Sequence, residues 1–213
     1  MNSRRRHGFT LIELLTVIML IGILVGIGLP SLSSLRSSGV SYGARLVANS
    51  LSLARQYAIT RRTFTRVVFY YDGTTQDATP ERRYNTYCII AYTNNAVSYN
   101  PASTAWWAPV SPWEDLPRGA FFGDSSCPYT AGALNSQRCD PMTFTAFKSR
   151  RARTLAYIEF NPTGAAVPKV GNVGTLSVFE GMMEADGKIT YAQNKNRIDI
   201  VYDGLVGHIR LLR

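Results

Sequence analysis

Apolar residues follow one another almost without interruption over residues 9–29, and this is the strongest pattern in the chain. As a helix, these 21 residues would span roughly 31 Å, about the thickness of the hydrocarbon core of a bilayer. The basic residues Arg4, Arg5 and Arg6 precede them. By the positive-inside tendency, the pattern predicts a single membrane-spanning helix over 9–30 whose amino terminus stays in the cytoplasm.

A second pattern occupies residues 31–62, where apolar positions recur at steps of three and four. These positions are Val40, Ala44, Val47, Ser50 with Leu51, Ala54 and Ala58. Such spacing places side chains on one face of a helix, so we expect the helix to continue as an amphipathic segment packed against a sheet. Gly39 and Gly43 weaken this segment and are the places where a bend is expected.

The remainder, 63–213, is expected to form a β-rich head. Predicted strands cover 65–71, 86–92, 120–122, 143–147, 154–160, 175–180, 196–202 and 206–212, with turns at 72–73, 161–164 and 203–204. Residues from about 94 to 150 are rich in Pro, Trp, Ser and Asn and look like an insertion. The chain has no repeat and no βαβ alternation. The predicted fold class is therefore α+β, with a long amino-terminal helix, transmembrane and then amphipathic, packed on an antiparallel globular head.

The apolar segment could be a signal peptide or a membrane anchor, and Glu13 helps to distinguish between such explanations. An ordinary cleaved signal peptide is excluded, because the run is too long and no small-residue cleavage site follows it. A plain signal anchor fits the length and the orientation. It does not account for Glu13, since a carboxylate within a membrane helix costs about 2.5–3.5 kcal/mol on insertion scales. An acid at this position is expected to have a partner or a function.

The run Gly8-Phe9-Thr10-Leu11-Ile12-Glu13 resembles the type IV prepilin signature, which type II secretion pseudopilins share. The resemblance implies that prepilin peptidase removes a leader, residues 1–8, by cutting between Gly8 and Phe9, and that Phe9 is then N-methylated. It also implies that the apolar helix forms the filament core and that Pro30 kinks it. Glu13 would pair with the terminal ammonium of a neighbouring subunit and set the axial register, because each charge compensates the other in lipid.

Later segments narrow the resemblance. The sequence of the predicted helix over 46–61, followed directly by a predicted strand, is similar to that of the GspH/FimT group of minor pseudopilins and minor pilins. The turn at 160–164 and the last hairpin around 207–210 fit the same group. The resemblance implies a structural subunit of the inner membrane, single-pass with a periplasmic head. Its partners would be prepilin peptidase and other pilin or pseudopilin subunits, in a type II secretion system or a related type IV pilus machine.

The charge balance introduces an alternative function. The formal net charge of +9 falls to +6 once Arg4, Arg5 and Arg6 leave with the leader. A basic run holds Arg150, Arg151 and Arg153, with Lys148 close by, while Arg210 and Arg213 lie near the carboxyl terminus. Such runs are usually solvated loops, but they also suit nucleic acid or acidic lipid headgroups. The resemblance includes relatives that serve DNA uptake, so the alternative function is a DNA-binding minor pilin, with nucleic acid as the less favoured partner.

Three cysteines bear on stability and on metal binding. If the head lies outside the cytoplasm, Cys127 and Cys139 are the pair expected to form a small disulfide loop. Cys88, within an apolar strand, is then expected to be a buried free thiol. The spacing of these cysteines and His208 fits no common zinc site, so no metal and no cofactor are predicted.

Enzyme chemistry finds no support in the sequence. His208 would have to serve any nucleophile–histidine–acid set, and no neighbouring residues recommend it, so an enzyme is not expected. The remaining candidate for recognition is the group Trp106, Trp107 and Trp113. The favoured interpretation is that these residues cover the core locally, and the alternative is a partner-binding surface.

Overall fold

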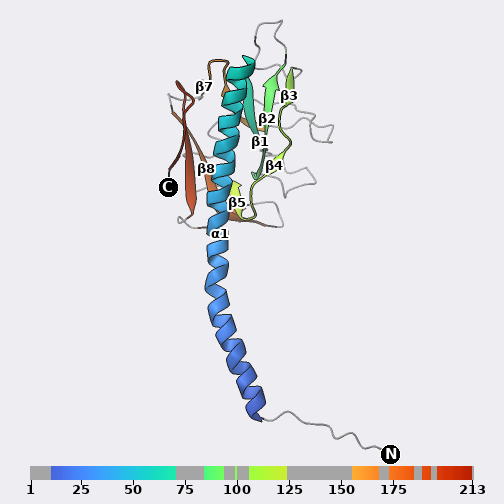
Figure 1. Cartoon of the computed structure of the whole chain (residues 1–213), viewed down its shortest axis with the longest axis vertical. Helices are drawn as coiled ribbons and strands as arrows, with labels where there is room; N and C mark the ends of the chain where they lie inside the picture. The colour runs from blue at the N-terminus through green and yellow to red at the C-terminus, as the bar shows by residue number, and fades with distance from the viewer. Residues whose placement is uncertain are drawn as a thin grey trace, which may run out of the picture.

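The computed structural model describes residues 11–70, 84–93, 99, 106–123, 155–167, 173–184, 189–192 and 196–212, with the side chains of 25–38 excluded. One helix, α1 (Leu11–Arg61), precedes the strands of this described part. The strands are β1 (Thr65–Tyr70), β2 (Thr86–Tyr92), β3 (Trp107–Pro109), β4 (Glu114–Asp115), β5 (Ala120–Phe122), β6 (Leu155–Phe160), β7 (Ala166–Val167), β8 (Val173–Met183), β9 (Ile189–Tyr191), β10 (Arg197–Asp203) and β11 (Ile209–Leu212). Figure 1 shows the first half of α1 projecting as a stalk from a β-rich head, while its second half lies against the strands of that head.

Two antiparallel sheets lie against the carboxyl-terminal half of α1 (Figure 1). The first sheet has the strand order β3-β2-β1-β6-β7, with β4 also paired to β2. The second has the order β11-β10-β8-β5, with β9 paired to β8. Every pairing between these strands is antiparallel, for example β1 with β2 and β8 with β10. The predicted α+β class with an antiparallel head is confirmed.

The predicted apolar face of the helix is buried in the head. Val40, Ala44, Val47, Leu51, Ala54 and Ala58 are each no more than 1% exposed. The helix runs on without interruption through Gly39 and Gly43. Both glycines permit close packing instead, because a Cβ at Gly43 would lie 3.2 Å from Pro117 and one at Gly39 would lie 3.4 Å from the Arg118 carbonyl.

The end of α1 is set by a Schellman-type cap. Arg62 adopts a left-handed φ of 51°. The Thr63 amide donates to the Ala58 carbonyl at 3.1 Å, and the Arg62 amide donates to the Ile59 carbonyl at 3.4 Å, which are the two bonds of that motif. Thr65 then donates its hydroxyl to the Ala54 carbonyl at 2.8 Å. These bonds turn the chain directly from helix into β1.

The first sheet is buried on both faces, because side chains alternate between two cores along each strand. On β1, Val67 and Phe69 enter the main core beneath α1, whereas Val68 and Tyr70 enter a second core on the opposite face. The second core also contains Cys88, Ile90, Tyr92, Trp107 and Leu155. The continuous burial of β1 and β2 therefore requires a covering layer on the face away from α1.

That layer comes partly from the region interpreted as an insertion. Tyr99 and Trp113 pack against the second core, and Trp107 belongs to it. Strands β3 and β4 extend the first sheet, while β5 joins the second through β8. The sequence did not predict β3, β4, β7 or β9, which are two or three residues long. The predicted strand at 143–147 and the turn at 72–73 lie outside the described residues.

Candidate functional site: the exposed apolar helix and its acid

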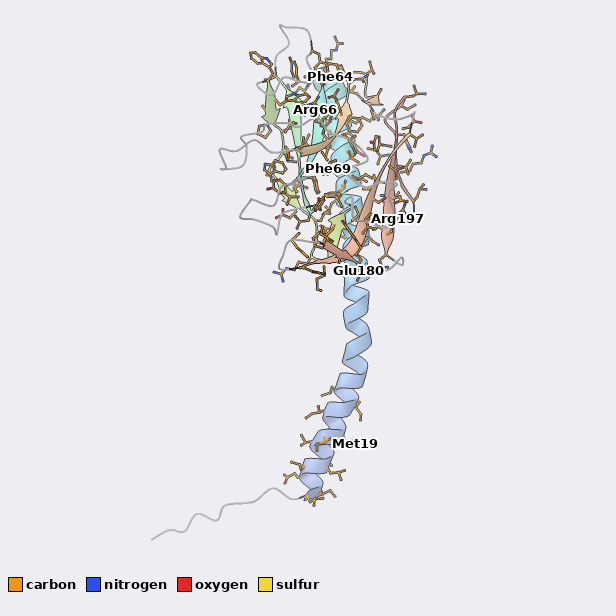
Figure 2. All side chains as sticks on the ribbon, turned by 180° about the vertical axis from the view of Figure 1, so that it is seen from behind. Met19, Phe64, Arg66, Phe69, Glu180 and Arg197 are labelled. Carbon is orange, nitrogen blue, oxygen red and sulfur yellow. The ribbon has the colours of Figure 1, made fainter. Side chains whose placement is uncertain are left out.

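The first part of α1 exposes an unusually apolar surface. Every residue from 11 to 24 is exposed, and the large apolar side chains among them range from 46% exposed for Val17 to 82% for Leu11. Figure 2 shows these side chains, with Met19 labelled, radiating from a stalk that lies clear of the head. Monomeric soluble proteins rarely expose contiguous apolar surface of this kind, which normally marks a protein or membrane contact.

Glu13 is the single charged residue within 11–24, and it is exposed. It lies in the first turn of α1, where a carboxylate interacts favourably with the partial positive charge of the helix amino terminus. The Thr16 hydroxyl donates to the Glu13 backbone carbonyl at 2.9 Å. The structure therefore places one carboxylate on a surface that is apolar apart from Glu13 and Thr16.

The structure describes only part of the segment predicted to span a membrane, residues 9–30. Across the residues whose side chains are described, no helical segment is both long enough and apolar enough to qualify as a membrane span. Pro30 lies within α1, so the chain does not break there, and a kink at that position stays a prediction. Gly8 and Phe9, the residues of the predicted cleavage, lie outside the described residues.

The candidate residues for disulfide and nucleic-acid contacts are mostly undescribed. Cys127, Cys139, Arg150, Arg151 and Arg153 all lie outside the described residues, so both predictions stand untested.

Arg210 is exposed on β11, where its Nε lies 3.2 Å from His208 Nδ1. Cys88 is a fully buried free thiol, as predicted, and burial raises the pKa of its thiol. No group of three or more histidine, cysteine, aspartate or glutamate side chains within the described part of the chain is arranged to hold a metal ion.

The three tryptophans divide between the two interpretations. Trp107 is 6% exposed within the second core, and Trp113 packs against that core. Trp106 is 44% exposed. The favoured interpretation, local cover of the core, is confirmed for Trp107 and Trp113 and not for Trp106.

A buried ion pair that the sequence did not predict anchors the covering layer. Arg66 Nε on β1 lies 2.6 Å from Glu159 Oε2 on β6, with side chains 1% and 7% exposed. The Arg66 guanidinium carbon lies 4.1 Å from the Trp107 ring centroid and 4.0 Å from that of Tyr157. The Tyr99 hydroxyl donates to Glu159 Oε2 at 2.5 Å.

The Arg66 cluster is structural in its chemistry. Its two charges satisfy each other, and its aromatic rings enclose the cation, so nothing reactive is presented to solvent. Burial, followed by the hydrogen bond to Glu159, raises the pKa of Tyr99. The sequence signal that could have revealed this ion pair is a single charged residue in each of two apolar strands. These residues are Arg66 and Glu159, and the β1–β6 register places them directly opposite each other.

Comparisons with known proteins agree with the amino-terminal features. Residues 3–29 match the family model described as the prokaryotic N-terminal methylation motif. A 68-residue segment, 32% of this chain, is 38% identical to the pilin-like protein PilA1 of Thermus thermophilus. That segment spans 43% of the relative's length, and no solved structure matches the chain. The two matches together support a type IV pilin-like protein.

Proposed function

We propose that this chain is a structural subunit of a filament in the cell envelope, of the minor class found in type II secretion systems and related type IV pilus machines. The observation that carries the proposal is the continuity of three features. A methylation motif over residues 3–29 overlaps a helix whose exposed residues 11–24 are apolar except for Glu13 and Thr16, and that helix continues into the core of the head. An exposed apolar stalk needs other helices or lipid to cover it.

The proposal gives each amino-terminal residue a role. Prepilin peptidase cuts between Gly8 and Phe9, Phe9 is methylated, and residues 9–30 anchor the chain in the inner membrane with the head in the periplasm. Assembly then withdraws the helix from lipid into the filament core. There the Glu13 carboxylate of one subunit pairs with the terminal ammonium of its neighbour, which compensates two charges that are each costly in an apolar medium.

The minor class within the GspH/FimT group is proposed from the order of elements. A helix that ends at Arg61 leads through a three-residue connection into β1, and the 161–164 turn joins β6 to β7. The Asn161 side chain holds this turn by accepting from the Thr163 and Ala165 amides at 3.0 and 2.9 Å. The short connection and the turn agree with the local sequence resemblance. They support the proposed subgroup.

Processing and assembly are tested by two substitutions in a host with a matching prepilin peptidase and filament machine. Gly8→Phe should accumulate precursor that retains residues 1–8, whereas Asn2→Leu, also within the leader, should mature normally. Glu13→Ala should insert and be processed but enter filaments at least tenfold less well, and Thr16→Ala is its matched control. Intact-mass analysis of the purified envelope protein measures processing, and sheared-filament immunoblots measure assembly.

Two results would contradict the proposal. Maturation of the Gly8 variant would remove the cleavage assignment, and normal incorporation of the Glu13 variant would remove the register role. The alternative, a DNA-binding minor pilin, rests on exposed basic residues at the end of α1 and on β11, namely Arg61, Arg62 and Arg210. A gel-shift titration of the head against salt distinguishes it, since phosphate contacts give a binding constant that falls steeply with salt.

A further inference from the structure

A pocket of about 530 Å³ opens at the end of the head from which the stalk projects, here called the proximal end. Its lining consists of Asn85, the continuous segment 115–121, Met183 and Glu184. Gly39 and Gly43 of α1 lie directly against residues 116–118 of this segment, which places the pocket beside the point where α1 enters the head. Glu180, a few residues before Met183 on β8, marks the same end of the head in Figure 2.

The pocket is firmly built. The Leu116 amide donates to the Asn85 carbonyl at 2.6 Å, and the Gly181 amide donates to the Gly119 carbonyl at 2.9 Å. These bonds tie the lining segment to β2 on one side and to β8 on the other. A pocket bounded by such contacts is largely preformed, so an occupant need not order it on binding.

The pocket lining combines apolar side chains with a net negative charge. Leu116, Phe121 and Met183 supply apolar surface, while Asp115, Glu184 and Arg118 supply two carboxylates and one guanidinium. Asp115 accepts from the Thr86 hydroxyl at 2.6 Å, and Glu184 accepts from the Thr190 hydroxyl. Each carboxylate has about four acceptor sites, so one hydroxyl leaves capacity for a basic partner.

The opposite, distal end of the head presents a complementary surface. Leu205 and Val206 are 70% and 59% exposed on the turn between β10 and β11. Their amides donate to Asp203 Oδ1 at 2.7 and 3.2 Å, and the Gly207 amide donates to the Asp203 carbonyl at 2.8 Å. The turn therefore holds two adjacent apolar side chains outward in a fixed conformation.

The turn is also braced by packing against Gly164 and Arg55, and exposed arginines lie at the same end of the head. Gly207, with φ of +66°, packs so closely on the Gly164 carbonyl and on Arg55 that any Cβ there would clash. Arg55 donates from Nε to the same carbonyl at 3.1 Å. Arg61, Arg62 and Arg210 are exposed near this end of the head, and Asp203 is the acid that the described turn contributes.

We propose that the distal turn of one copy of this chain docks into the proximal pocket of a second copy displaced along the axis of α1. Leu205 and Val206 would cover the apolar lining, while neighbouring arginines would approach Asp115 and Glu184. Parallel subunits in a filament bring the proximal end of one head toward the distal end of another, with an offset of roughly 32 Å for a head that follows α1 from Val40 to Arg61. Such a head-to-tail contact is heterologous and does not close on itself, as a filament requires.

This inference rests on the proposed filament function and adds that the subunit is used in more than one copy. It is tested with the full-length chain in its host, as two co-expressed copies with different epitope tags. One copy carries Arg118→Cys in the pocket, which leaves both carboxylates in place, and the other carries Leu205→Cys on the turn. Mild oxidation of intact envelopes should yield a disulfide-linked product that bears both tags. The matched control pairs Arg118→Cys with Leu53→Cys, because Leu53 is 52% exposed on the carboxyl-terminal half of α1.

A charge test accompanies the cross-linking. Combined Asp115→Asn and Glu184→Gln changes should lower the cross-linked yield by about tenfold, on the scale of lost charged hydrogen bonds. Glu114→Gln is the control, because Glu114 is exposed beside Asp115 but does not line the pocket.

The outcomes separate the inference from the function on which it rests. Processed, filament-incorporated protein without the 118–205 product would overturn the docking and leave the proposed function standing. Products linking only 118 to 118 or 205 to 205 would indicate symmetric pairing and would also overturn it. Failure of the unmodified chain to be processed or incorporated would instead contradict the proposed function.

Discussion

Arg66 and Glu159 are charged residues that are buried in the head, and each compensates the charge of the other. Arg66 lies in a strand whose six residues are all buried, yet it is paired with Glu159 and enclosed by two aromatic rings. Isolated buried charges are costly, so the cluster holds together only while both partners and the covering rings are present. Because Trp107 and Tyr99 belong to the covering layer, the ion pair also fixes that layer onto the first sheet.

Arg66→Met should therefore destabilise the head by about 3–5 kcal/mol, since it leaves the Glu159 carboxylate buried and unpaired. Adding Glu159→Met to the same protein should recover part of that loss, because no lone charge then remains. Arg197→Met is the control, as the Arg197–Asp199 pair is 28% and 22% exposed and should contribute about 1 kcal/mol or less. Urea unfolding followed by circular dichroism measures each value, and equal losses for Arg66 and Arg197 variants would contradict the argument.

Cys88 allows a second prediction at the residue scale. Burial raises the pKa of its thiol above the ordinary value of 9.0, so the folded protein favours the neutral form. The contribution of Cys88 to the free energy of unfolding should be constant below about pH 9 and should fall above it, as the unfolded thiol ionises, by at most about 1.4 kcal/mol per pH unit. Cys88→Ala should reduce this alkaline slope.

Alkylation provides an independent check on Cys88. Iodoacetamide at pH 8.5 should leave Cys88 unmodified in the folded head and should modify it fully in urea, because only the exposed thiolate is a good nucleophile. Peptide mass spectrometry distinguishes Cys88 from Cys127 and Cys139. Rapid modification of Cys88 under native conditions would show that the second core is open.

At the scale of elements, α1 performs two tasks with two different surfaces. Its carboxyl-terminal half buries a narrow stripe of small residues, which lets the helix lie close to both sheets. Its amino-terminal part exposes large apolar residues on every side. The first surface belongs to the fold of one chain, and the second requires an environment that one chain does not supply.

Ala54→Asp should consequently disrupt the head, while Gln56→Asp should be tolerated. Ala54 is fully buried between the sheets, whereas Gln56 is exposed two residues further along the same helix. A carboxylate at the buried position has no partner, and we expect a loss of about 3 kcal/mol or more, against about 0.5 kcal/mol at the exposed position. Thermal melting of the two variants measures the difference, and similar melting temperatures would contradict the assigned face.

The whole molecule combines a self-contained head with a dependent stalk. The main core draws on residues from Val40 to Tyr202, and none of the described residues before Val40 contributes to it. Stability and assembly are therefore separable properties of this chain.

Removal of residues 1–30 should leave a soluble head whose melting temperature is within a few degrees of that of the full chain in detergent. The reason is that none of the residues 11–24, the part of the deleted segment whose side chains the structure describes, belongs to the main core. Differential scanning calorimetry of both forms provides the measurement. A deletion that also removes residues 31–47, with Val40, Ala44 and Val47, is the control and should unfold the head. Aggregation of the shorter deletion would show that the stalk contributes to folding.

The sequence by itself determined the features that depend on local pattern. The apolar run with Glu13, the helical face from Val40 to Ala58 and the strands β2 and β5 were all readable, because spacing alone decides which side chains share a face. The methylation motif belongs to the same class, since it is a continuous segment of the chain, residues 3–29.

Tertiary structure decided what depends on residues far apart in the chain. Arg66 and Glu159 are separated by 93 positions and meet only through the β1–β6 register. Residue 99 and residues 106–123, part of the region that looked like an insertion, acquire their role by covering the first sheet and by forming β3, β4 and β5. The pocket and the turn likewise arise from long-range packing: Gly43 meets Pro117, and Gly207 meets Gly164. Periodicity specifies which face of an element is buried, but only the assembled sheets determine what lies against that face.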